Sequence, residues 1–266
     1  MRVCLSMISL QKLEGSVAVI TGAGRGLGAA LAISLAEAGC RPILCGRTRE
    51  ALEGVASTIL KRTGRLAMIV ELDLADADSV KRAVAEVRAD HAVVDILINN
   101  GAMWLERSPE DHSPEEVLGV VNAAVSGTFL LTQGLLPLLR GSDHPDIVTI
   151  GSISGLPNAA IQTVSVPFYA AKRAQSALAE GFAQMLAGSP VRSLAVHPPY
   201  LEDIEPGGAV WEGALERRKG ERATNRDVVD AVLFGVTRPR HVSLSIVVDA
   251  DEGGRFASPL GVGDGR

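Results

Sequence analysis

A glycine-rich turn near the start of the chain has the composition of a phosphate-binding site. Residues 17–28 read V-A-V-I-T-G-A-G-R-G-L-G, an apolar run followed by glycines and then by a helical pattern. Gly22, Gly26 and Gly28 carry no side chain, so a diphosphate could approach the free N–H groups and the positive end of the following helix. We expect a dinucleotide site here, with Leu27 of the same turn among its contacts.

Two arginines indicate which dinucleotide this is. Arg47 follows the second expected strand in C-G-R-T, and no Asp or Glu occurs between Ile43 and Arg49. At this position an acidic residue accepts a hydrogen bond from the ribose, whereas a basic one neutralises a 2′-phosphate. Arg25, inside the glycine turn, adds a second charge. The pair favours NADP, with NAD as the alternative.

The elements that must position these residues alternate along the chain. Strands are expected near 17–21, 41–46, 66–71, 94–98, 146–151, 191–197 and 243–249, and helices near 26–38, 48–62, 77–89, 114–139, 168–187 and 225–236. This alternation predicts a single α/β domain of the Rossmann type, with a doubly wound, mainly parallel seven-stranded sheet flanked by helices.

The domain is expected to span 13–250, between an N-terminal extension at 1–12 and a tail at 251–266. Met7 is an alternative start. The stretch 198–224 is rich in proline, glycine and charge, so we expect a loop beside the substrate.

Composition excludes several classes of protein. The chain has 266 residues and a net charge of -5, which argues against a nucleic-acid partner. No uncharged apolar run approaches the roughly 20 residues of a membrane span. Its three cysteines lack metal-type spacing, which favours a reducing, cytoplasmic compartment without disulfides or a metal site.

Polar residues end two further strands, at the edge where ligands bind to open α/β sheets. Asp73 in E-L-D-L could accept a hydrogen bond from an adenine amine. Asn99 and Asn100, in I-N-N-G-A, carry amides that could tie neighbouring strands to the cofactor. Leu74 and Gly101, which follow these polar residues, complete the expected cofactor contacts.

In these motifs the chain resembles the short-chain dehydrogenase/reductase family, over about residues 13–250. T-G-A-G-R-G-L-G is similar to the family's cofactor motif, N-N-G-A to its N-N-A-G, and S-I-V-V-D-A-D-E-G-G to its last strand and V-D-G-G ending. The resemblance implies a nicotinamide cofactor, hydride transfer at a carbonyl or alcohol carbon, and a homotetramer or homodimer.

The resemblance also implies catalytic residues. Asn122 in V-V-N-A-A-V is similar to the catalytic asparagine of the long central helix, where it would help a water relay. Ser152 in I-G-S-I-S-G matches the serine after the fifth strand, with Ser154 as a second candidate. This serine would hydrogen-bond the substrate oxygen.

The tyrosine segment departs from the family pattern Y-x-x-x-K. Here F-Y-A-A-K-R places Lys172 three residues after Tyr169. Alignment on Lys172 puts Phe168 where the tyrosine belongs, and alignment on Tyr169 puts Arg173 where the lysine belongs. Either cation therefore remains a candidate neighbour of the phenol.

Ketone reduction needs an acid beside the developing alkoxide, and a phenol of pKa about 10 serves only if a cation lowers that value. Because positions i and i+3 are neighbours on a helix, we predict that Tyr169 is this acid and Lys172 its activating cation, both also contacting the cofactor. The chain would then reduce a carbonyl or oxidise a secondary alcohol. The alternative is a weakly active or inactive nucleotide-binding sensor or assembly subunit.

The substrate side is unusual as well. Where the family has P-G, an apolar residue and a threonine at the nicotinamide amide, this chain reads H-P-P-Y-L-E-D-I. Pro199 replaces the glycine, so the Leu201 backbone or Glu202 would make the equivalent contact. Tyr200 and Trp211 are expected substrate walls.

The stretch 117–139 has more apolar positions than one core-facing stripe needs. We expect one of its faces to meet another subunit.

Overall fold

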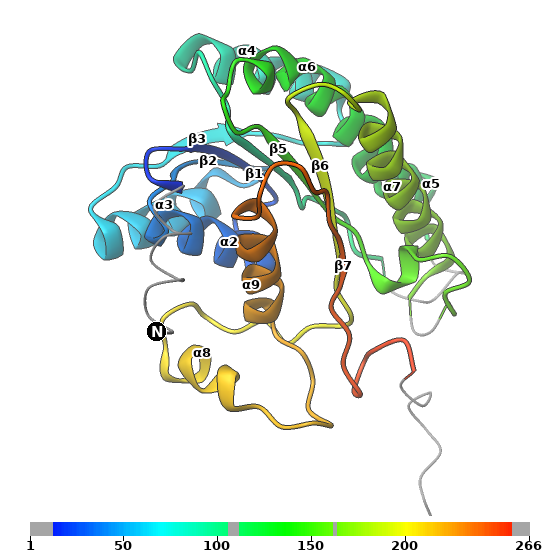
Figure 1. Ribbon diagram of the computed structural model, residues 1–266. Helices are drawn as coiled ribbons and strands as arrows, with labels where there is room; N and C mark the ends of the chain where they lie inside the picture. The colour runs from blue at the N-terminus through cyan, green and yellow to red at the C-terminus, as the bar shows by residue number, and fades with distance from the viewer. Residues whose placement is uncertain (1–12, 106–111, 162–163, 257–266) are drawn as a thin grey trace, which may run out of the picture.

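A parallel sheet of seven strands crosses the centre of the molecule, in the order β3-β2-β1-β4-β5-β6-β7 (Figure 1). The computed structural model describes residues 13–105, 112–161 and 164–256. The strands are β1 (Val17–Thr21), β2 (Arg41–Gly46), β3 (Met68–Glu71), β4 (Ile96–Asn99), β5 (Asp146–Ile150), β6 (Arg192–His197) and β7 (Ser245–Val247). The order reverses between β1 and β4, which places a ligand crevice at their carboxyl ends.

Helices cover both faces of the sheet. They are α2 (Gly26–Glu37), α3 (Arg49–Thr63), α4 (Ala77–Asp90), α5 (Pro114–Val121), α6 (Thr128–Arg140), α7 (Val166–Met185), α8 (Ala209–Gly213) and α9 (Asn225–Val236), with short turns η2 (Asn122–Gly127), η3 (Ile153–Gly155) and η4 (Ala214–Glu216). Helices α2, α3 and α9 lie on one face, and α4, α6 and α7 on the other (Figure 1).

Strand alternation divides the core into these two layers. On β1, Ala18 and Ile20 pack toward α2, α3 and α9, whereas Val17 and Val19 pack toward α4 and α6. Both faces of each central strand are buried, as expected for a parallel sheet between two helical layers. The expected α/β fold is confirmed.

The long helix expected at 114–139 is not uniform. It consists of α5, a π-helical turn at η2, and α6, so the expectation of one regular helix is wrong at residues 122–127. By length and composition the stretch could cross a membrane, with a mean hydropathy of 1.3. In this fold it is a partly buried element that packs against α4 and α7.

The other predicted boundaries differ from the structure at the ends of elements. Helix α7 begins two residues earlier than predicted, because the Ser165 side chain caps it by accepting a hydrogen bond from the Phe168 N–H. The expected loop at 198–224 contains α8 and η4. Residues 1–12 of the expected extension and 257–266 of the expected tail lie outside the described residues.

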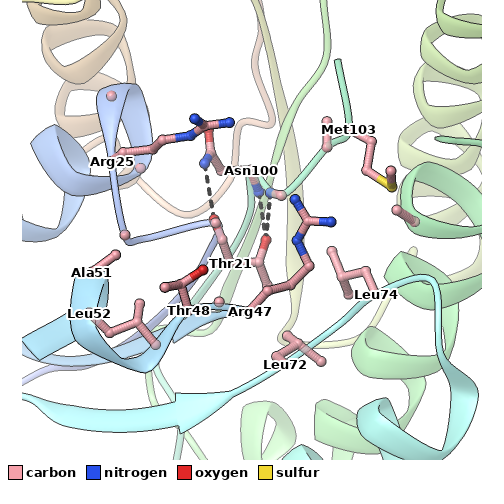
Figure 2. A pocket seen from close by; sticks show the side chains of 18 of the residues that line it. Thr21, Arg25, Arg47, Thr48, Ala51, Leu52, Leu72, Leu74, Asn100 and Met103 are labelled. Carbon is pink, nitrogen blue, oxygen red and sulfur yellow. Dashed lines mark hydrogen bonds between the residues drawn. The ribbon is translucent and has the colours of Figure 1, made fainter. Parts of the chain in front are cut away.

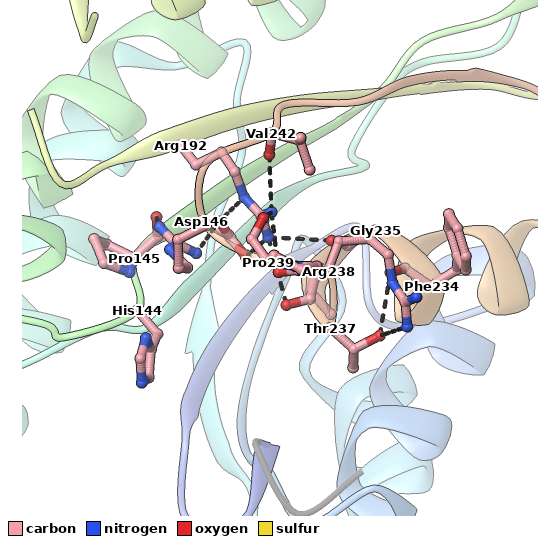
Figure 3. Close-up of polar contacts among 12 residues, drawn as sticks. His144, Pro145, Asp146, Arg192, Phe234, Gly235, Thr237, Arg238, Pro239 and Val242 are labelled. Carbon is pink, nitrogen blue, oxygen red and sulfur yellow. Dashed lines mark hydrogen bonds and ion pairs between the residues drawn. The ribbon is translucent and has the colours of Figure 1, made fainter. Parts of the chain in front are cut away.

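An ion pair is buried at the amino-terminal ends of the strands, opposite the carboxyl ends that form the crevice. Asp146 and Arg192, the first residues of β5 and β6, are register partners, and two bonds of 2.8 Å join the guanidinium to the carboxylate. Figure 3 shows the same guanidinium reaching carbonyls at the end of α9 and in the loop before β7. Arg192 thus fixes that connection, away from the ligand-binding edge.

Candidate active site

A cleft of about 710 Å³ opens at the carboxyl ends of β1, β2 and β4 (Figure 2). Its walls are formed by Thr21, Gly22, Gly24, Arg25, Gly26, Leu27, Gly28, Gly46, Arg47, Thr48, Ala51, Leu52, Leu72, Asp73, Leu74, Asn100, Gly101, Ala102, Met103, Ala123 and Asp203. Nine residues predicted to bind the cofactor are among them: Gly22, Arg25, Gly26, Leu27, Gly28, Arg47, Asp73, Leu74 and Gly101. We call this space the cofactor cleft.

The glycine turn is shaped for a close approach to the backbone. Gly22 and Gly26 have positive φ angles of 66° and 52°, a backbone conformation that residues with a side chain rarely adopt. A Cβ on Gly28 would lie 2.0 Å from the Gly22 carbonyl oxygen. Helix α2 begins at Gly26 without a side-chain cap and without an acidic residue in its first turn. Its first N–H groups can therefore receive a diphosphate, and the residues present fit that group.

Arg25 and Arg47 both reach into the cofactor cleft (Figure 2). Among the described residues, neither guanidinium has a carboxylate within ion-pair distance. The neighbouring Arg49, by contrast, is paired with Glu53 and Glu71. The two arginines are thus available to an anionic ligand.

The two asparagines after β4 have separate surroundings. The Asn100 side chain donates to the Thr21 carbonyl at 3.0 Å, and its backbone N–H donates to the Thr21 hydroxyl at 2.9 Å. Asn99 is buried and donates to the Thr132 hydroxyl at 3.1 Å, on the side of α6. The expectation that Asn99 contacts the cofactor is therefore corrected: Asn100 lines the cleft, and strand alternation turns Asn99 away.

Asp73 keeps only part of its carboxylate free, because one oxygen accepts a hydrogen bond of 2.9 Å from the Ala75 N–H. The other oxygen has no partner among the described residues. The residue lines the cofactor cleft between Leu72 and Leu74, its neighbours in the chain. The adenine contact of Asp73 stays a prediction.

A second cleft of about 330 Å³ adjoins the first and shares Leu27, Asn100, Ala102 and Asp203 with it. We call it the substrate cleft. Ser152, Ser154 and Lys172 line it, together with Trp104, Phe168 and Tyr200. A ligand here would meet three aromatic rings and a small polar group of hydroxyls and one ammonium.

Lys172 is the buried cation of the substrate cleft. Its ammonium donates to the Ile150 carbonyl at 3.1 Å and to the Gln175 side-chain oxygen at 2.8 Å. Burial lowers the pKa of Lys172 to about 8. Since an ammonium has three N–H donors, one remains for a ligand. Arg173 instead donates to the Gly155 carbonyl at 3.4 Å, so Lys172 is the cation of this cleft.

The structure does not bring Tyr169 to this group. Its hydroxyl donates to the Ala159 carbonyl at 2.8 Å, and Phe168 is the neighbour that lines the substrate cleft. The expected pairing of Tyr169 with Lys172 is therefore corrected. Because successive helix residues point about 100° apart, the two adjacent rings face different surroundings. Tyr169 faces the loop before α7, and Phe168 faces the substrate cleft.

Ser152 and Asn122 have different positions relative to the clefts. The Ser152 hydroxyl accepts the Ser154 N–H at 3.1 Å at the start of η3, and both serines line the substrate cleft. Asn122 begins the π-helical turn. Of the described residues near Asn122, it is Ala123 that lines the cofactor cleft. The structure thus places Ser152 and Lys172 in the lining of the same cleft, whereas Asn122 lines neither the cofactor cleft nor the substrate cleft.

The aromatic walls differ partly from those predicted. Tyr200 lines the substrate cleft, as expected. Trp211 is buried in the core, so the expectation that it forms a wall of the substrate site is wrong. Trp104, which the sequence analysis missed, stacks edge-on against Phe168 with ring centres 4.8 Å apart. A tryptophan shortly after the asparagine pair, at the ligand-binding edge, is the signal that could have revealed it.

The segment after β6 also departs from expectation. Glu202 pairs with Arg217 at 2.7 Å and does not line the clefts formed by the described residues. Leu201 lines the substrate cleft, as does Asp203, which the sequence analysis missed. The expectation for Glu202 is corrected, since it is Asp203, the next residue, that lines both clefts.

A comparison with known families accounts for this arrangement. The model of the short chain dehydrogenase family matches residues 16–204. The chain belongs to the short-chain dehydrogenase family. It is 27% identical over 233 residues to an uncharacterized oxidoreductase of Staphylococcus aureus strain USA300, covering 88% of this chain and 96% of that one.

Solved structures of the family share the fold. A short chain dehydrogenase from Burkholderia cenocepacia, in complex with NADP, is 26% identical with a TM-score of 0.75 and covers 92% of this chain and 99% of that one. L-sorbose reductase from Gluconobacter frateurii, complexed with NADPH and L-sorbose, shares the fold with a TM-score of 0.77 at 22% identity, covering 92% of this chain and 98% of that one. This short-chain dehydrogenase is thus an oxidoreductase by family.

Proposed function

We propose that this short-chain dehydrogenase is an NADP(H)-dependent oxidoreductase that interconverts a carbonyl compound and a secondary alcohol. The observation that carries the proposal is the pair Arg25 and Arg47, which lines one cleft without a carboxylate partner among the described residues. A 2′-phosphate matches such a pair of guanidinium groups. The NADP bound to the similar Burkholderia protein supports the same cofactor.

The bound dinucleotide would supply or accept the hydride. In the adjoining cleft, the Ser152 hydroxyl would donate a hydrogen bond to the substrate carbonyl oxygen. The Lys172 ammonium would then protonate that oxygen as its negative charge develops. An amine whose pKa is about 8 is largely protonated at neutral pH yet gives up its proton more readily than an ordinary lysine. It would regain the proton from solvent.

The test combines binding and turnover. Calorimetric titration should detect NADPH binding, and NADPH oxidation should follow when a panel of aldehydes and ketones is added. Lys172→Met should abolish turnover, and Ser152→Ala should lower it by about 100-fold, as for a lost transition-state hydrogen-bond donor. Turnover that survives in Lys172→Met would exclude the lysine as the acid, and a protein that binds no dinucleotide would exclude the function.

A second candidate is a dinucleotide-binding protein without turnover. The observation favouring it is the Tyr169 hydroxyl, which donates to Ala159 rather than facing the substrate cleft. Such a protein would report or stabilise a bound nucleotide, alone or within an assembly. NADPH binding with no oxidation across the whole carbonyl panel would favour this candidate over the reductase.

A further inference from the structure

An acidic side chain lies against the glycine turn of the cofactor cleft. A Cβ built on Gly26 would be 2.7 Å from one carboxylate oxygen of Asp203 and 3.4 Å from the other. Gly26 is the first residue of α2. The carboxylate therefore lies at the helix end that suits a diphosphate. Asp203 also lines the substrate cleft, so it stands where the two clefts meet.

The backbone that carries Asp203 is held on both sides. The buried Asn225 side chain binds both backbone groups of Ile204: its oxygen accepts the N–H at 3.2 Å, and its nitrogen donates to the carbonyl at 2.9 Å. The Glu202 N–H donates to the Ala223 carbonyl at 2.9 Å. Because the chain on either side is fixed to residues 223–225, the carboxylate leaves the turn only by rotation of its own side chain.

The segment beyond Ile204 is fastened as well. Arg62 of α3 donates to the Pro206 carbonyl at 2.8 Å, and it is paired with Glu37 of α2. The strap formed by residues 202–206 thus crosses the layer of α2 and α3. The position of Asp203 follows from these long-range contacts rather than from a free loop.

The charges around the carboxylate explain why it can stay there. Helix α2 presents its positive end, uncapped by a side chain. Burial raises the pKa of Asp203, and the nearby Arg25 opposes that rise. The other charged side chains that line the same clefts are Arg47 and Asp73 in the cofactor cleft and Lys172 in the substrate cleft, and Glu205 lies beside Asp203 on the outer surface.

We propose that Asp203 is an internal anion that competes with the cofactor diphosphate for the N-terminus of α2, so that NADP(H) binds only as this carboxylate turns away or takes up a proton. The inference rests on the proposed function, since it concerns the same dinucleotide site. Two anions cannot share one helix end without strong repulsion. Asp203 therefore sets the affinity and its pH dependence.

The test compares three proteins by calorimetric titration with NADPH: wild type, Asp203→Asn and Glu205→Gln. Asp203→Asn keeps the size of the side chain and removes its charge, so the Kd should fall on the order of tenfold. Glu205→Gln is the matched control, because Glu205 is on the same strap but does not line the cofactor cleft. Its Kd should stay within about twofold of wild type.

The pH dependence supplies a second measurement. As the pH rises through the range in which the Asp203 carboxyl loses its proton, which burial places above that of an ordinary aspartate, the Kd of wild type should increase relative to that of Asp203→Asn. The ratio of the two Kd values removes the titration of Lys172 and of the cofactor's 2′-phosphate, which both proteins share. Asp203→Ser should reproduce the tighter binding, because it also removes the charge and has no amide that could make a new contact with the cofactor.

Each outcome is decisive. Binding of NADPH that is tighter in both Asp203 variants than in wild type supports the proposal. Equal or weaker binding than wild type overturns it while leaving the proposed function intact, since Asp203 would then be neutral or a cofactor ligand. Failure of all the proteins to bind NADPH would overturn the proposed function together with this inference.

Discussion

The ammonium of Lys172 lies over the Phe168 ring, 5.8 Å from its centre. Lys172 follows Phe168 by four positions in the chain, the spacing at which the family motif Y-x-x-x-K places its lysine after its tyrosine. An apolar ring thus occupies the place of the phenol, and the cation beside it is retained. The sequence permits either alignment of this motif, and the structure selects the alignment on Lys172.

Phe168→Tyr should therefore create a proton donor beside Lys172. We expect kcat for carbonyl reduction to rise by about 100-fold or more, because general acid catalysis contributes 10² to 10⁴. Initial rates of NADPH oxidation with a panel of aldehydes and ketones measure this gain. A rate that does not change would show that the ring at this position does not face the reacting oxygen.

Tyr169→Phe is the matched control, since it removes a hydroxyl from the adjacent residue. That hydroxyl contacts the Ala159 carbonyl, so its loss should cost about 1 kcal/mol of stability and leave turnover within about twofold. A large loss of turnover in Tyr169→Phe would restore that tyrosine as the acid.

The buried charge of Lys172 should make stability depend on pH. Its pKa is about 8 in the folded protein and 10.5 for an ordinary lysine, so between these values the unfolded chain binds more protons. Stability should therefore rise with pH across this window. Lys172→Met should remove the dependence and stabilise the protein at pH 7 by up to about 3 kcal/mol. Urea unfolding at several pH values measures both effects, and an unchanged slope in the variant would contradict them.

Local motifs determine most of what the sequence predicts correctly here. The glycine turn, Arg25 and Arg47 follow strands whose apolar pattern is unambiguous, and the parallel order brings their carboxyl ends together. Ser152 and Lys172 are placed by the same logic. These residues reach the clefts because their positions depend on the nearest strand or helix.

The residues that were predicted wrongly, such as Tyr169, or missed, such as Asp203, depend on contacts outside their own helix or strand. Tyr169 turns to Ala159 because the preceding loop lies beside it, and spacing along a helix does not reveal that loop. Asp203 reaches Gly26 because Asn225 holds the neighbouring backbone, a contact between residues 21 positions apart. No local pattern records either contact.

Arg47→Ala should remove the preference for the phosphorylated cofactor. Wild type should bind NADPH about ten- to hundredfold more tightly than NADH, the effect of about 1.5–3 kcal/mol for hydrogen bonds to a charged group. Arg49→Ala is the control, because Arg49 is an exposed neighbour already paired with Glu53 and Glu71. Calorimetry with both cofactors decides the matter, and equal affinities in wild type would refute the NADP assignment.

The outer faces of α5 and α6 should meet a second subunit. Leu118 is 60% exposed, and Val121, Phe129 and Leu130 are also exposed apolar residues on this stretch. Light scattering should show a dimer or tetramer at micromolar concentration, and Leu118→Asp should shift it toward the monomer. Leu66→Asp is the control, because Leu66 is an exposed leucine just before β3, the strand at the other edge of the sheet. This variant should leave the molar mass of the assembly unchanged. A monomeric wild type would rule out this interface.

Breaking the buried pair of Arg192 and Asp146 should destabilise the fold without altering the cofactor cleft. Their side chains are 3% and 2% exposed. Arg192→Met should cost about 3–5 kcal/mol, because it leaves the Asp146 carboxylate buried with Arg240 alone and frees carbonyls at the end of α9. Urea unfolding measures the loss, and Arg49→Ala, which breaks only exposed ion pairs, should leave the midpoint nearly unchanged. The pair and the clefts lie at opposite ends of the strands, so the folded variant should bind NADPH as wild type does. A weaker affinity of the folded variant for NADPH would mean that the amino-terminal ends of β5 and β6 influence the cofactor cleft.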